Sequence, residues 1–267
     1  MVNGIIINGV KYPSVAGTFY PADREELIKM LKSFENQVKE EIEEFIANHE
    51  INEIKALISP HAGYIYSGIV AMYGYKLLYF FKKEIKDVLI AGPSHYAYFY
   101  DFIQPSFKYW LTPLGKVKVK HLNFLPKVNE PFIPEHSVEV QIPFLQYFYK
   151  DYFDLTPLLA GEVHDLEFFN RVKNYYELFI ISSDLSHYLP YEEAVKRDLR
   201  TIEFILKKDI KGFIKYGDAC GKEAIKSLLI TAKKENWNVA LLKYLNSGDT
   251  AGTKEQVVGY ASIVFYK

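Results

Sequence analysis

The segment Val88-Leu89-Ile90-Ala91-Gly92-Pro93-Ser94-His95 gives the clearest indication of the fold. Its leading apolar residues show no alternation, which is typical of a short strand buried on both faces of a sheet. Glycine and proline then interrupt the strand, and a histidine follows in the loop. A similar order recurs in Ala56-Leu57-Ile58-Ser59-Pro60-His61 and in Phe179-Ile180-Ile181-Ser182-Ser183-Asp184, with His187 just beyond. The repeated pattern indicates parallel strands that carry polar residues at their carboxyl ends.

Helical patterns separate the short apolar runs. Asp23 opens the first helix, with Glu26 three residues later as in a capping box. Further helices are expected at residues 67–81, 137–149 (bent at Pro143), 164–176, 192–207 and 222–236, and strands at 54–58, 88–91, 117–119, 155–159, 178–181, 239–245 and 257–265. This alternation predicts an α/β fold, a single three-layer α/β/α domain over residues 1–267 with a largely parallel or mixed sheet. The last two strands are joined without a helix, which predicts an antiparallel edge.

Composition excludes several classes of protein. The formal net charge of −1 comes without a Lys/Arg cluster free of acids, so nucleic acid is not an expected partner. No stretch approaches the roughly 20 apolar residues of a membrane span, and residues 1–11 lack the pattern of a signal peptide. A single cysteine forms no internal disulfide, which fits a reducing compartment. We therefore expect a cytoplasmic protein that does not bind membranes.

The histidines follow the strands at equivalent places. His61, His95 and His187 each come after an apolar run, and open α/β sheets bind ligands outside the carboxyl ends of their strands. If these strands are neighbours, the imidazoles lie within reach of one another. Neutral imidazole suits iron, zinc, copper or nickel. The sequence therefore predicts a polar site that holds a metal, without naming the metal.

Other polar residues allow two interpretations each. Glu135-His136-Ser137 reads by itself as a helix-start cap with a solvated histidine. Asp184 either orients His187 through a carboxylate–imidazole hydrogen bond or caps a turn. Cys220 precedes a helical stretch, where a thiolate is favoured and serves as ligand or nucleophile, yet a lone cysteine is commonly an inert small hydrophobe.

Taken together, these segments resemble the Memo family of intracellular proteins. The resemblance covers most of the chain and is carried by Val15-Ala16-Gly17-Thr18-Phe19-Tyr20-Pro21, Pro60-His61-Ala62-Gly63-Tyr64-Ile65-Tyr66-Ser67-Gly68, Gly92-Pro93-Ser94-His95, Glu135-His136-Ser137-Val138-Glu139, Ser182-Ser183-Asp184-Leu185-Ser186-His187 and Cys220-Gly221. It implies a fold similar to that of the class III extradiol ring-cleavage dioxygenases, and radical-SAM and AMMECR1-type proteins as partners.

The resemblance also implies a metal site formed by His61, His95 and Cys220. The pocket residues that it implies are Asp184, His187, Phe19 and Tyr66. The dioxygenases hold non-haem Fe(II) with two histidines and a carboxylate, so a cysteine in the third position departs from their pattern. Iron is the expected metal, with copper or zinc as alternatives, because a thiolate raises affinity for Cu(I) and zinc.

Three functional hypotheses remain open. The first is a metal-dependent oxidoreductase, dioxygenase-like, acting on a small substrate, with an aromatic compound as one candidate. His187 and Asp184 would be catalytic, His136 would be a second proton-handling residue, and Phe19 and Tyr66 would bind substrate. The second is a non-catalytic adaptor whose pocket binds a peptide or protein. The third is metal-free hydrolysis or thiol chemistry, with Cys220 as nucleophile and a histidine, His61 or His187, as base.

Overall fold

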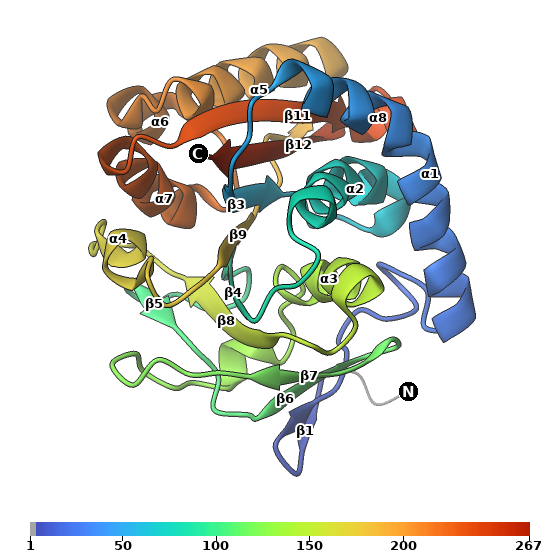
Figure 1. Ribbon diagram of the computed structural model, residues 1–267, viewed down its shortest axis with the longest axis vertical. Helices are drawn as coiled ribbons and strands as arrows, with labels where there is room; N and C mark the ends of the chain where they lie inside the picture. Colours follow the sequence, from blue (N-terminus) through green and yellow to red (C-terminus); the bar gives the residue numbers. More distant parts are fainter. Residues whose placement is uncertain (1–3) are drawn as a thin grey trace.

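The computed structural model describes residues 4–267. The molecule is built on a 12-stranded mixed sheet in the order β1-β2-β6-β7-β8-β4-β9-β3-β12-β10, with β11 paired to β12 and β5 paired to β8 (Figure 1). The strands are β1 (Ile6–Ile7), β2 (Val10–Lys11), β3 (Ile54–Ser59), β4 (Asp87–Pro93), β5 (Phe102–Ile103), β6 (Tyr109–Thr112), β7 (Gly115–Val119), β8 (Asp154–Ala160), β9 (Leu178–Ser182), β10 (His187–Leu189), β11 (Asn238–Asn246) and β12 (Val257–Tyr266).

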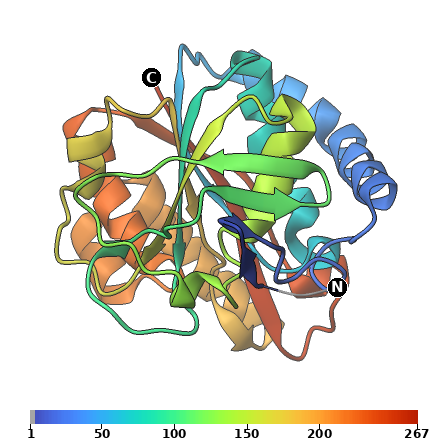
Figure 2. The same ribbon diagram turned by 90° about the horizontal axis from the view of Figure 1, so that it is seen from below.

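Helices cover both faces of this sheet, which confirms the three-layer α/β prediction. The α-helices are α1 (Arg24–Asn48), α2 (Tyr64–Phe81), α3 (Ile142–Tyr149), α4 (Phe168–Val172), α5 (Tyr191–Leu206), α6 (Ile210–Tyr216), α7 (Lys222–Lys234) and α8 (Ser247–Thr250), with 3₁₀ turns η1 (Glu130–Phe132) and η2 (Glu139–Gln141). Seen from below, α1, α2 and α3 lie on one side of the central strands, and the yellow α4 and the orange α6 and α7 lie on the other (Figure 2). No helix within residues 4–267 has the length and apolarity needed to cross a membrane.

The strands that carry the histidine motifs are neighbours. Strand β9 lies between β3 and β4, is parallel to both, and sets Ser182 beside Ser59 and Ile181 beside Ala91. All three carboxyl ends therefore meet at one edge of the sheet, which is the condition that the sequence left open. Strand β11 pairs antiparallel with β12 along its length, so the predicted antiparallel edge is confirmed.

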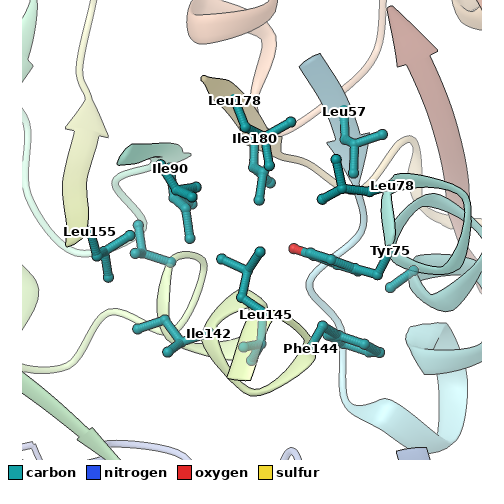
Figure 3. Packing of buried hydrophobic residues seen from close by; sticks show 14 of the residues in the cluster. Leu57, Tyr75, Leu78, Ile90, Ile142, Phe144, Leu145, Leu155, Leu178 and Ile180 are labelled. Atoms are coloured by element: carbon teal, nitrogen blue, oxygen red, sulfur yellow. The ribbon is translucent and has the colours of Figure 1, made fainter. Parts of the chain in front are cut away.

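Each side of the sheet has its own apolar core, because alternate strand residues point to opposite faces. Leu57, Ile90, Leu178 and Ile180 pack with residues from α2 and α3, including Tyr75 and Leu145 (Figure 3). The intervening strand residues pack against α4, α5, α6 and α7 on the other face. A strand buried on both faces has a continuous apolar sequence, so these strands could be predicted from the sequence.

Helix α1 begins where the sequence predicts. The Asp23 carboxylate accepts the backbone N–H groups of Glu25 at 2.9 Å and Glu26 at 3.0 Å, so the cap satisfies two donors of the first turn. Leu27 and Leu31 are buried on the inner face of the helix.

Two predicted helices were wrong in extent. The helix expected at 164–176 is confined to α4, because Asp101 accepts the backbone N–H groups of His164 and Asp165 and holds them in a loop. The helix expected at 137–149 starts with η2 and becomes α-helical only at Ile142. Pro143 lies in the first turn of α3 and bends no helix, since proline there removes no intrahelical hydrogen bond. Helix α6 and the strands β1, β2, β5, β6 and β10 were not predicted; most are too short to show a period. The expectation that no helix joins the last two strands was wrong, because the short helix α8 lies between β11 and β12.

Candidate metal centre

The predicted site residues gather beyond the carboxyl ends of β3, β4 and β9. The ring centroids of His61 and His95 are 5.4 Å apart, and those of His61 and His136 are 5.5 Å apart. Asp184 follows β9 and accepts the backbone N–H of His61 at 2.7 Å. The sheet thus brings together side chains from segments more than a hundred residues apart in the sequence.

These residues line one pocket of about 680 Å³. Its lining includes four histidines and a carboxylate, together with four aromatic side chains. These residues are His61, His95, His136, His187 and Asp184, and Phe19, Tyr66, Tyr188 and Tyr260. A pocket of this volume suits a small organic molecule.

His61 is a buried residue in the pocket lining, and each of its ring nitrogens contacts another side chain. Its Nδ1 lies 2.9 Å from Ser182 Oγ, and its Nε2 lies 3.2 Å from Cys220 Sγ. Burial, together with repulsion from the nearby His95, lowers the pKa of His61 to about 3. The ring is therefore neutral at physiological pH, which is the form that binds metals.

The Cys220 thiol completes a three-residue cluster. Ligand atoms of His61, His95 and Cys220 all lie within 4.8 Å of one another. Burial, reinforced by the nearby Asp184 carboxylate, raises the pKa of Cys220, although its sulfur accepts the backbone N–H of Asp184 at 3.1 Å. The expected preference for a thiolate at a helix start is therefore wrong for the metal-free chain, because α7 begins only at Lys222 and desolvation dominates.

Glu135 is a site residue whose role the sequence did not reveal. One of its carboxylate oxygens lies 2.9 Å from His95 Nδ1, and the other accepts the backbone N–H of His95 at 2.8 Å. Burial alone would raise the pKa of Glu135, but hydrogen bonds from the ring and backbone of His95 outweigh it and lower that pKa to about 2. Burial lowers the pKa of His95, yet this carboxylate outweighs it and the net shift is upward. In the sequence, Glu135 is marked by its position directly before His136 at an expected helix start.

His136 is not the solvated histidine that its helix-start position suggested. Its side chain is 14% exposed, its ring is stacked on His95 with centroids 4.7 Å apart, and Phe19 packs on it at 4.7 Å. Burial and repulsion from His61 lower the pKa of His136 to about 4. The ring is therefore neutral at physiological pH and lines the pocket without a charge.

Asp184 does not hold His187 in the structure. Its carboxylate accepts the His61 backbone N–H, and burial raises the pKa of the group. Among residues 4–267 no hydrogen bond joins Asp184 to the His187 ring, which instead lies on β10, opposite Val258. The Asp184 carboxylate thus joins the loop after β9 to the loop after β3, rather than orienting His187 or capping a turn of its own loop.

His95, Glu135 and His136 form a second group of possible ligands. One oxygen of Glu135 already receives the backbone N–H groups of His136 at 2.9 Å and Ser137 at 2.8 Å as well as the His95 ring, and the other is bonded to the His95 backbone. A carboxylate with its lone pairs used in this way is a poor first ligand. The group built on His61 and Cys220 is the better candidate.

Glu139 anchors the segment that supplies Phe19 to the pocket. Its carboxylate accepts the backbone N–H groups of Ser14 and Val15 and the hydroxyl of Tyr20, at distances of 2.8 to 3.0 Å. The segment around Phe19 is thereby fixed beside His136. Nothing in its spacing distinguishes Glu139 from an ordinary helical acid.

The chain was compared with known families and proteins. The family model described as Memo-like protein matches residues 11–264. A MEMO1 family protein of Thermoplasma acidophilum is 36% identical over 273 residues, which cover 94% of this chain and 97% of the relative. A MEMO1 family protein of Thermoplasma volcanium is 36% identical over 276 residues (96% and 98%), and one of Pyrobaculum arsenaticum is 36% identical over 285 residues (97% and 99%). Since the family model and these relatives span nearly all of it, the chain belongs to the Memo-like protein family.

Proposed function

We propose that this chain is a metal-dependent redox protein that acts on a small, aromatic substrate. His61, His95 and Cys220 would hold the ion, with iron as the first choice and copper or zinc as alternatives. The observation that carries the proposal is the convergence of their ligand atoms within 4.8 Å, next to a pocket with an aromatic wall.

The donor set fits a metal ion in both chemistry and spacing. Nitrogen and thiolate ligands at about 2.0 and 2.3 Å from a tetrahedral ion lie roughly 3.5 Å from one another. The 3.2 Å between His61 Nε2 and Cys220 Sγ is close to that separation. The Nδ1 atoms of His61 and His95 contact Ser182 and Glu135, which leaves Nε2 of each ring for an ion.

The surrounding residues have roles of their own. A bound iron or copper ion would supply one-electron chemistry next to the pocket. His136, neutral at physiological pH, would accept a hydrogen bond from a bound phenol or amine, and His187, also in the pocket lining, would be the proton-handling residue. Phe19 and Tyr66 flank the space where a planar substrate stacks.

Elemental analysis tests the proposal directly. The full chain is purified without an affinity tag and compared with His61→Ala, Cys220→Ser and the control His164→Ala, whose side chain is 62% exposed. We expect near-stoichiometric metal in the wild type and the control, and loss of metal in the two site variants. A wild-type protein that stays empty after anaerobic reconstitution with iron, copper and zinc contradicts the proposal.

An adaptor role is the second candidate, and exposed aromatic residues near the pocket support it. Tyr188 lines the pocket with 69% of its surface exposed, and Tyr96, directly after His95, is 60% exposed. Aromatic side chains are enriched at sites that bind proteins and peptides. Binding of a peptide that survives His61→Ala but is lost in Tyr188→Ala would favour this role.

A further inference from the structure

A buried polar network lies directly behind His61. Ser182 is at the end of β9, and its hydroxyl contacts His61 Nδ1 at 2.9 Å, Gln141 Nε2 at 2.8 Å and the backbone carbonyl of Ser137 at 2.6 Å. Gln141 is in η2, and the side chains of Ser182, His61 and Gln141 are at most 2% exposed. Bulk water therefore does not substitute for any partner, so the hydrogen-bonding capacity of each atom can be counted.

Two backbone carbonyls set the direction of every hydrogen bond in the network. The carbonyl of Pro60 accepts from Gln141 at 2.9 Å, so the amide nitrogen must face it. The amide oxygen is on the other side and accepts the Tyr75 hydroxyl at 2.7 Å. The amide nitrogen also lies 3.4 Å from the backbone carbonyl of Ser59, but its two shorter contacts, to Pro60 and Ser182, take its two hydrogens.

Ser182 has a single hydrogen to give. The carbonyl of Ser137 is only an acceptor, so the Ser182 hydroxyl hydrogen goes to it. The remaining capacity of Ser182 Oγ is two lone pairs, and Gln141 occupies one of them. The contact with His61 is possible only if the imidazole donates its Nδ1 hydrogen to the other.

From this count we infer that Ser182, oriented by Gln141, is a positioning residue that holds His61 as the Nδ1–H tautomer. The bare Nε2 lone pair then faces Cys220 Sγ and His95. The opposite tautomer would leave a buried Nδ1 without a donor and direct a hydrogen toward the cluster. The purpose assigned to this tautomer, metal binding, rests on the proposed function; the tautomer itself follows from the hydrogen-bond count alone.

Long-range proton–nitrogen NMR spectra of the ¹⁵N-labelled, metal-free full chain test this inference near neutral pH. We expect the His61 hydrogen on Nδ1 in the wild type and a shift toward the Nε2–H form in Ser182→Ala. The matched control is Ser59→Ala, because Ser59 is the register partner of Ser182 on β3 and its buried hydroxyl makes no hydrogen bond to His61, Ser182 or Gln141. The control should keep the wild-type tautomer.

Zinc affinity, measured by competition with a chromogenic chelator, is the second readout. Loss of an outer-shell partner typically lowers metal affinity about 10–100-fold, so we expect that loss in Ser182→Ala and not in Ser59→Ala. A wild-type protein with the hydrogen on Nε2 overturns the inference, and the wild-type spectrum decides this even if Ser182→Ala fails to fold. A Ser182→Ala protein with the wild-type tautomer overturns it too. The Nδ1–H tautomer in a wild type that binds no zinc, iron or copper would support the inference and contradict the metal-site proposal.

Discussion

Lys11 and Glu139 form an ion pair with an Nζ–Oε2 distance of 3.0 Å, and both side chains are fully buried. The ammonium also contacts Ser14 Oγ at 2.8 Å and lies 4.5 Å from the centre of the Trp110 ring. Burial lowers the pKa of Lys11, and attraction to Glu139 opposes that shift. The pair connects strand β2 to the turn before α3, so the N-terminal segment is tied to the wall of the pocket.

Removing one member of this pair should be costly. Glu139→Ala leaves a buried ammonium without its counter-ion, and breaking a buried pair in this way typically costs about 3–5 kcal/mol of unfolding free energy. Urea unfolding of the metal-free protein measures the change. The control is Glu43→Ala, which removes the exposed i,i+4 pair with Lys39 and should cost less than about 1 kcal/mol. Equal effects of the two substitutions would contradict a structural role for the buried pair.

Stability should fall as the pH is lowered through the range in which the pocket histidines would gain a proton. The folded-state pKa of His136 is about 4, below its ordinary 6.5, so the unfolded chain binds the proton more readily. The stabilising contribution is complete above pH 6.5 and is lost as the pH falls from 6.5 through 4. His61, with a pKa of about 3, acts with the same sign.

For His136 alone the shift corresponds to about 3 kcal/mol at low pH. Urea unfolding at a series of pH values should show a shallower acid limb in His136→Gln than in the wild type. His164→Gln is the control, since that ring is exposed and should leave the limb unchanged. A wild-type stability that is flat across this window would contradict the burial of neutral histidines.

The sequence predicts the strands that form this site, but it does not predict which side chains meet there or how deeply they are buried. Continuous apolar runs located β3, β4 and β9, and the shared edge of parallel strands then placed His61 and His95 together. Spacing does not encode which carboxylate meets which ring, so the bond between Glu135 and His95 was not foreseen. The position of Cys220 before a helix suggested a lowered thiol pKa. Burial, which the local sequence does not reveal, raises that pKa instead.

Glu135 should affect metal binding although it is not one of the three expected ligands. Glu135→Gln keeps the shape of the side chain but loses its charge and part of its capacity to accept hydrogen bonds, so the His95 ring is held less firmly and becomes less basic. We expect zinc affinity to fall about 10–100-fold, as measured by chelator competition. Glu162→Gln is a suitable control, since that carboxylate contacts the exposed His164. Wild-type affinity in Glu135→Gln would show that the carboxylate serves only to cap the backbone.

Metal uptake should release a proton from Cys220. Burial raises the pKa of this thiol, so it is protonated in the metal-free chain at neutral pH, whereas the ligand form is the thiolate. His61 is already neutral and releases none. Calorimetric titration with zinc in buffers of different ionisation enthalpy should therefore report about one proton released per ion at mildly alkaline pH, because only the thiol must lose one. At lower pH the number should rise, since the raised pKa of His95 leaves part of that ring protonated. Cys220→Ser should bind weakly and release no proton at alkaline pH; release that persists in this variant would mean that another group, and not the thiol, supplies the proton.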